Sequence, residues 1–174
     1  MKKLRQLLGR TDGSQVAEAA AVMPVMFLIF LGIFWFGRAY NIYATINHAA
    51  REGARAAAVG SCATCGNTPL NGDQIGQVVA NAMLASKLDP LRATPLMPSY
   101  NHCDGTPASC QQPPSGYPQM CIYNSVVLNA PNSGPPSCGV AISFQYPYQF
   151  YLPFSSLGGQ AIQLKAQVQM AGEY

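Results

Sequence analysis

Six cysteines are the residues of this sequence with the most evident capacity for chemistry. Cys62 and Cys65 form a CxxC, which could be a redox motif, half of a zinc site or a local disulfide at a turn. A redox motif would open a helix beside a strand, whereas this one enters a loop rich in Gly, Asn and Pro. A zinc site would need a second close pair, and Cys103 and Cys110 are too widely spaced for that. We therefore expect structural disulfides, with no metal and no cofactor, and the sequence does not choose among the pairings of Cys62, Cys65, Cys103, Cys110, Cys121 and Cys138.

Other residues that could do chemistry are scattered. His102, Cys103 and Asp104 are adjacent, but neighbours on an extended loop point in different directions. No paired-carboxylate, nucleophile-elbow or phosphate-loop pattern occurs in the sequence. We expect no catalytic residue, so an enzyme anchored in the cell envelope is the weakest of the functional classes considered.

Glu18 is the most informative single residue. It stands at the start of an apolar run, where an ionised carboxylate is costly unless it is paired. Alternatively, it lies in the first turn of a helix, at the level of the lipid headgroups, and favours the positive end of the helix dipole. The residues alone leave both interpretations open.

The run that follows Glu18 is long enough to cross a membrane. Residues 19–37 contain no charge and many large apolar side chains. A helix rises about 1.5 Å per residue, so roughly 20 residues span a hydrocarbon core of about 30 Å. A core helix of a soluble protein would show a polar face, and a signal peptide would be shorter and end at a small-residue cleavage site. We therefore expect a single transmembrane helix, which Pro24 should bend or locally unwind.

Charge indicates how this helix is oriented. The cations Lys2, Lys3, Arg5 and Arg10 all precede the apolar run and favour an N-terminus in the cytoplasm. The remainder would then lie in the periplasm or outside the cell, where cysteines oxidise. After residue 56 the formal charge is slightly negative, because this part of the chain has three cations and four acids. The cations are Lys87, Arg92 and Lys165, and the acids are Asp73, Asp89, Asp104 and Glu173. We expect no nucleic-acid partner, since no cationic surface is concentrated there.

The chain after the span predicts a small α+β domain. The helix should continue over residues 41–59, where Ala49, Gly53 and Ala57 make a narrow seam for another helix or for its own domain. Residues 73–87 predict an amphipathic helix that ends before Asp89 and Pro90, and a long proline-rich loop stapled by disulfides follows to residue 118. Strands are expected over residues 120–128, 138–146 and 161–171, as an antiparallel sheet laid against the long helix.

The order of the N-terminal features resembles a type IV prepilin. A basic stretch precedes Gly13, Ser14 follows it, and Glu18 is the fifth residue after the glycine. The resemblance implies that a prepilin peptidase cuts between Gly13 and Ser14, and that Glu18 then neutralises the terminal amine of a neighbouring subunit. An amine and a carboxylate enter an apolar bundle at tolerable cost only as a pair. Cleavage would remove four cations and Asp12, changing the formal side-chain charge from +3 to 0.

A closer resemblance covers residues 13–60. The Glu18 region, Pro24, Phe36-Gly37-Arg38 and the block Ala49-Ala50-Arg51-Glu52-Gly53-Ala54-Arg55 resemble the TadE-like pseudopilin family of tight-adherence (Flp, type IVb) pilus systems. The resemblance implies a minor pilin or pseudopilin that takes part in pilus assembly for adherence or related secretion. Its partners would be the prepilin peptidase, other pilins and pseudopilins, the inner-membrane assembly machinery and membrane lipid.

These inferences predict three regions and one competing function. Residues 1–13 would be a cytoplasmic leader, 14–60 the transmembrane and extended helix, and 61–174 a disulfide-linked α+β domain in the periplasm. The protein would sit in the bacterial inner membrane as a single-pass protein, and incorporation into an extracellular pilus is compatible with this topology. The alternative is a monomeric, membrane-anchored envelope binding module that is neither processed nor assembled as a pilin.

Overall fold

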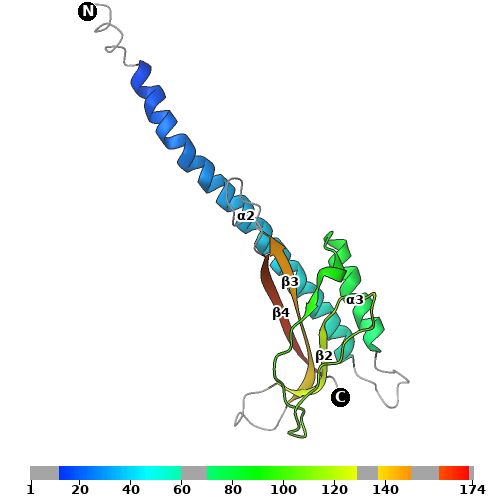
Figure 1. Ribbon diagram of the computed structural model, residues 1–174. Helices are drawn as coiled ribbons and strands as arrows, with labels where there is room; N and C mark the ends of the chain where they lie inside the picture. The colour runs from blue at the N-terminus through cyan, green and yellow to red at the C-terminus, as the bar shows by residue number, and fades with distance from the viewer. Residues whose placement is uncertain (1–11, 60–69, 129–136, 150–160, 173–174) are drawn as a thin grey trace, which may run out of the picture. The chain divides into compact units, whose positions relative to one another are not determined.

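The computed structural model describes residues 12–59, 70–128, 137–149 and 161–172 (Figure 1). The predicted α+β class is confirmed. Its elements in chain order are the helices α2 (Asp12–Ala58) and α3 (Gly72–Ala85), the 3-10 helix η1 (Pro90–Arg92), and the strands β1 (Thr94–Pro95), β2 (Cys121–Val127), β3 (Cys138–Gln149) and β4 (Ala161–Ala171).

The chain divides into two compact units, Met1–Ala39 and Tyr40–Tyr174. The division falls inside α2, so the last 19 residues of this helix belong to the second unit. In the first unit the helix continues through Pro24, which removes one backbone donor without ending the helix.

In the second unit α2 buries one stripe of small and β-branched side chains. The stripe recurs every three to four residues, as expected for a helix that packs on one side, and contains Ile42, Ile46, Ala49, Ala50, Gly53, Ala54 and Ala58. Its opposite side is exposed, and there His48 Nε2 lies 3.9 Å from Glu52 Oε1. The predicted continuation of the helix over residues 41–59 therefore packs within the domain.

Helix α3 begins one residue before the predicted start and ends two residues before the predicted end. The backbone N–H of Asn71 donates to Gln74 Oε1 over 3.0 Å at its start, and Ile75, Val79 and Met83 are buried along one face. The helix stops at Ala85, not at the predicted residue 87. Lys87 adopts a left-handed conformation with φ 58°, and the backbone N–H groups of Lys87 and Leu88 donate to the carbonyls of Leu84 and Met83. This Schellman-type turn, and not the Asp89-Pro90 pair, ends the helix.

Strand β3 is the centre of the antiparallel sheet. Its first half pairs with β2, from Cys138↔Val127 to Ser143↔Cys121, and Gln145 and Phe144 pair with β1. Along its other edge β3 pairs with the whole of β4, from Gly139↔Ala171 to Gln149↔Ala161. The predicted strand 161–171 is confirmed residue for residue, whereas β3 runs three residues beyond the predicted end, through Pro147.

The two faces of the sheet pack against different parts of the chain. On one face Ile142 lies next to Gly53 of α2, and Phe144 is fully buried. On the other face Tyr123, Cys121, Val126 and Ala141 form a cluster that is covered by Tyr100, Ala108, Cys110 and Leu128. The rings of Tyr100 and Tyr123 meet edge to face with centroids 5.0 Å apart. The proline-rich segment between β1 and β2 is thus a packed layer of the domain.

Candidate functional site

The predicted processing and assembly residues lie at the start of α2. The helix includes Gly13 and Ser14, and Glu18 follows Ser14 by four residues. Residues four apart on a helix lie on the same side, one turn apart. The Glu18 side chain is exposed within the chain. The backbone thus places the predicted cleavage point and the predicted assembly acid on one side of the helix.

A continuous apolar surface follows Glu18. Large apolar side chains between Val16 and Phe36 are 48–71% exposed, and they are Val16, Val22, Met23, Val25, Met26, Phe27, Leu28, Ile29, Phe30, Ile33, Phe34 and Phe36. Among the described residues one helix is long and apolar enough to cross a membrane, with a mean hydropathy of 2.4 over its most apolar window. A surface of this size and composition requires lipid or other apolar helices around it.

The small-residue seam after the span has a partner inside the domain. A Cβ placed on Gly53 would lie 2.5 Å from Val79 Cγ2 and 3.1 Å from Ile142 Cδ1. Ala49 is fully buried and Ala57 is half-buried. Of the two interpretations of the seam, packing on its own domain is the one that the structure shows.

Comparison with protein families identifies this helical region. Residues 13–55 match the family model described as TadE-like protein. This segment is similar to the TadE-like family. The match begins at Gly13, covers about a quarter of the chain and confirms the resemblance inferred from the sequence. Comparison with curated proteins and with solved structures gives no match. The family suggests involvement with Tad pilus systems.

Outside the TadE-like segment, four cysteines form two disulfides. Cys103 pairs with Cys138 across 35 positions of sequence, and Cys110 pairs with Cys121 across 11. Both bonds tie the proline-rich segment to the sheet, because Cys138 begins β3 and Cys121 begins β2. Cys62 and Cys65 lie outside the described residues, so a structural disulfide at the CxxC stays a prediction.

The adjacent residues His102, Cys103 and Asp104 turn to separate partners, as predicted for loop neighbours. His102 Nδ1 lies 3.0 Å from the carbonyl oxygen of Asn124, while Cys103 is in its disulfide. Asp104 Oδ1 accepts hydrogen bonds from the hydroxyl and the backbone N–H of Thr106 over 2.6 and 2.9 Å. These bonds, led by the hydroxyl, hold the pKa of the Asp104 carboxyl below its ordinary value. Asp104 therefore stabilises a local turn, while His102 and Cys103 contact residues distant in the chain, and the three side chains do not converge on one point.

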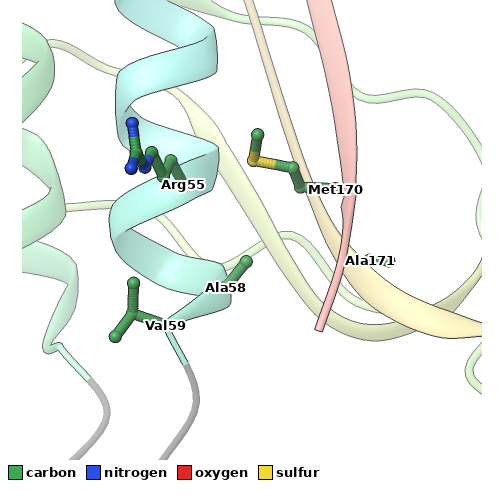
Figure 2. Close-up of a pocket in the computed structure, with 5 residues that line it drawn as sticks. All are labelled: Arg55, Ala58, Val59, Met170 and Ala171. Atoms are coloured by element: carbon green, nitrogen blue, oxygen red, sulfur yellow. The ribbon is translucent and has the colours of Figure 1, made fainter. Parts of the chain in front are cut away.

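A small pocket lies between the end of α2 and the end of β4 (Figure 2). It has a volume of about 240 Å³ and is lined by Arg55, Ala58, Val59, Met170 and Ala171. Figure 2 shows Met170 extending from β4 toward the helix. Among the described residues of this lining, Arg55 is the one that carries a charge. Within the described ranges no group of three or more His, Cys, Asp or Glu residues could hold a metal ion.

Sequence reasoning missed one exposed group of residues, at the turn after α3. Leu84 and Leu91 are 56% and 63% exposed, and Lys87 and Arg92 beside them in the chain are also exposed. Leu84 belongs to an amphipathic helix and Leu91 follows a proline. The hydrophobic periodicity of the sequence therefore does not mark either leucine as part of an exposed surface. The available signal was the presence of three leucines and two cations within residues 84–92.

Proposed function

We propose that this protein is a minor pilin or pseudopilin that takes part in assembly of a tight-adherence pilus. The observation that supports the proposal most directly is the TadE-like segment, residues 13–55, with its exposed apolar helix and Glu18 at the start. In this role the chain has no active site and acts through packing of its helix among those of other pilins and pseudopilins. Adherence or related secretion would be the function of the assembled pilus.

The proposed location is the bacterial inner membrane. The apolar part of α2 would span the bilayer once, with the basic N-terminus in the cytoplasm and the second unit in the periplasm. The two disulfides agree with an oxidising compartment. The assembly machinery of the inner membrane and the surrounding lipid would be the first contacts of the newly inserted protein.

Processing at Gly13 is the step on which the pilin role depends. A prepilin peptidase would hydrolyse the Gly13–Ser14 peptide bond, leaving the carboxyl group on Gly13 and a new amine on Ser14. Glu18 would pair with the terminal amine of an adjacent subunit. In an apolar bundle each of the two charges would be strongly destabilising without the other.

The test is intact-mass and N-terminal analysis of the membrane protein, expressed with and without the prepilin peptidase. A start at Ser14 that depends on the peptidase supports the proposal. Gly13→Val should abolish the shortened form, whereas the matched leader substitution Gly9→Val should leave it. Retention of Met1 in every sample would contradict processing as a pilin.

A second candidate is a monomeric, membrane-anchored binding module. The observation in its favour is that two disulfides hold the proline-rich segment in a defined shape on the sheet, as a recognition surface requires. The same experiment separates the two candidates, because a binding module would keep residues 1–13 and remain outside the pilus. Its ligand would then be sought on the second unit.

A further inference from the structure

Leu84, Lys87, Leu91 and Arg92 form a surface at the end of the second unit where the chain enters it. The chain enters this unit at Tyr40. Helix α2 runs antiparallel to β3, because its final residue Ala58 lies by Met170 and Ala171, and these pair with the first residues of β3. The first residues of α2 in this unit therefore lie level with the last residues of β3. We call this the Tyr40 end.

The turn after α3 lies at the same end. The guanidinium carbon of Arg92 stands over the ring of Tyr146, 5.7 Å from its centroid, and Thr94 pairs with Gln145. Both partners belong to the later half of β3. In Figure 1 the last turn of α3 and the arrowhead of β3 are seen at the same end of this unit. The exposed leucines and cations therefore lie at the same end of the unit as Tyr40, where the chain enters.

Aromatic residues at this end are exposed as well. Tyr40 is 72% exposed and Tyr43 is 46% exposed. Tyr40 follows Gly37, the last residue of the uncharged run, by three positions in the chain, a reach of at most about 11 Å even when fully extended. Chain connectivity alone therefore keeps the Tyr40 end close to the end of the apolar run, however the two units are oriented.

The conformation of Lys87 is a separate observation. Its φ of 58° is in the left-handed region, where glycine is the usual residue at the end of a helix. A lysine in this conformation costs free energy that glycine would avoid. Asp89 is the acid within this surface, and its Oδ1 accepts the backbone N–H of Leu91 over 3.0 Å. That bond fixes the start of η1 and leaves Leu91 facing solvent.

We propose that this surface rests on the headgroup layer of an anionic bilayer. Leu84 and Leu91 would enter the boundary between headgroups and acyl chains, Lys87 and Arg92 would contact lipid phosphates, and Tyr40 and Tyr43 would lie at the same depth. Leucines next to cations, together with tyrosines, are the side chains that interact favourably with the interfacial layer of an anionic bilayer. This inference rests on the membrane anchor of the proposed function.

The test uses tryptophan fluorescence of the full chain in vesicles of phosphatidylglycerol and phosphatidylcholine that carry brominated lipid. The natural Trp35 is the one tryptophan of the chain and reports on the anchor. In a Trp35→Phe background, Leu91→Trp reports on the proposed surface. Leu70→Trp is the matched control, because Leu70 is an exposed leucine just before the opposite end of α3. Leu84→Trp is the second reporter if Leu91→Trp does not fold.

We expect bromine near the headgroups to quench the Leu91→Trp reporter at least about twofold more than the Leu70→Trp control. Equal quenching of the two reporters, with Trp35 quenched by deeply placed bromine, would overturn this inference and leave the anchor in place. Such a result would point to a protein partner for the surface. Absence of Trp35 quenching would overturn the anchor, and this inference with it.

The role of charge is tested at Lys87. Lys87→Gly suits the left-handed backbone and removes the cation, so it should reduce quenching of the Leu91→Trp reporter in anionic vesicles and not in neutral ones. Lys87→Arg should retain the quenching. Unchanged quenching by Lys87→Gly in anionic vesicles would contradict the proposed contact with phosphate.

Discussion

Gly53 of α2 lies against Val79 of α3 so closely that any side chain at position 53 would collide with it. A Cβ there would come 2.5 Å from Val79 Cγ2. We expect Gly53→Ala to lower the free energy of unfolding by about 1–3 kcal/mol, because the valine is β-branched and has little freedom to move. The measurement is denaturant unfolding of the full chain in nanodiscs, followed by near-ultraviolet circular dichroism of the tyrosines.

A double-mutant cycle with Val79→Ala isolates this contact. The second substitution should remove the collision, so the two should destabilise less together than the sum of their separate effects. Gly72→Ala is the control, because a Cβ at position 72 would meet nothing nearer than 3.9 Å. Additive effects in the cycle would show that Val79 does not set the size limit at position 53.

Gly139 is the one glycine in the described strands, and we expect it not to tolerate a side chain. A Cβ at this position would overlap the carbonyl oxygen of Met170 and come 2.6 Å from Leu128 Cδ1. Since the oxygen belongs to the backbone of the paired strand, relief would require β3 and β4 to separate. We expect Gly139→Ala to cost at least about 3 kcal/mol in the same unfolding assay. Gln145→Ala on the same strand, where a Cβ already exists, should cost about 1 kcal/mol or less.

The two described disulfides should each contribute substantially to the stability of the second unit. The chain-entropy relation predicts about 4 kcal/mol for the 35-residue separation of Cys103–Cys138 and about 3 kcal/mol for the 11-residue separation of Cys110–Cys121. Paired replacement by alanine, compared in the unfolding assay, checks these values. Peptide mapping without reduction checks the pairing itself, and a peptide linking Cys103 to Cys110 would contradict it.

Thr106 should control the titration of Asp104. The folded carboxyl has a lowered pKa, so its favourable contribution is present above the pKa of the unfolded chain and is lost as pH falls through the lowered folded pKa. Thr106→Val removes the hydroxyl donor and should move the pKa of Asp104 upward, toward its ordinary value. A carboxyl-carbon NMR titration measures this. Thr94→Val is the control, because it makes the same substitution at an exposed threonine that does not bond to Asp104. It should leave the pKa of Asp104 unchanged.

Glu18→Ala should leave membrane insertion intact and reduce pilus assembly. If the carboxylate pairs with a terminal amine in an apolar bundle, removing it leaves an uncompensated charge, which costs about 3–5 kcal/mol. Counting of pili by electron microscopy, with membrane fractionation as the insertion control, measures both effects. Glu52→Ala changes the other glutamate of α2 and should not reduce assembly. Normal piliation with Glu18→Ala would contradict the pairing.

The sequence by itself determined the features that a short stretch of chain encodes. Residues 19–37 predict a membrane-spanning helix because they are apolar and none of them carries a charge. The alternation of apolar and polar side chains over residues 161–171 predicted β4 to the residue. The Gly13, Ser14 and Glu18 order and the blocks around it were sufficient to predict the TadE-like segment. In each case the information lies within one helix or strand, where period and composition are directly readable.

Only the tertiary structure decided which distant residues meet. The six cysteines allowed many pairings, and the folded chain brings Cys103 to Cys138 and Cys110 to Cys121. The Ala49–Gly53 seam was equally suited to an outside helix until Val79 and Ile142 filled it. The end of α3 was misplaced because Lys87, a residue that rarely adopts a left-handed conformation, forms the final turn. These outcomes depend on contacts between segments far apart in the chain. Local sequence patterns do not predict which of these segments will come into contact in the fold.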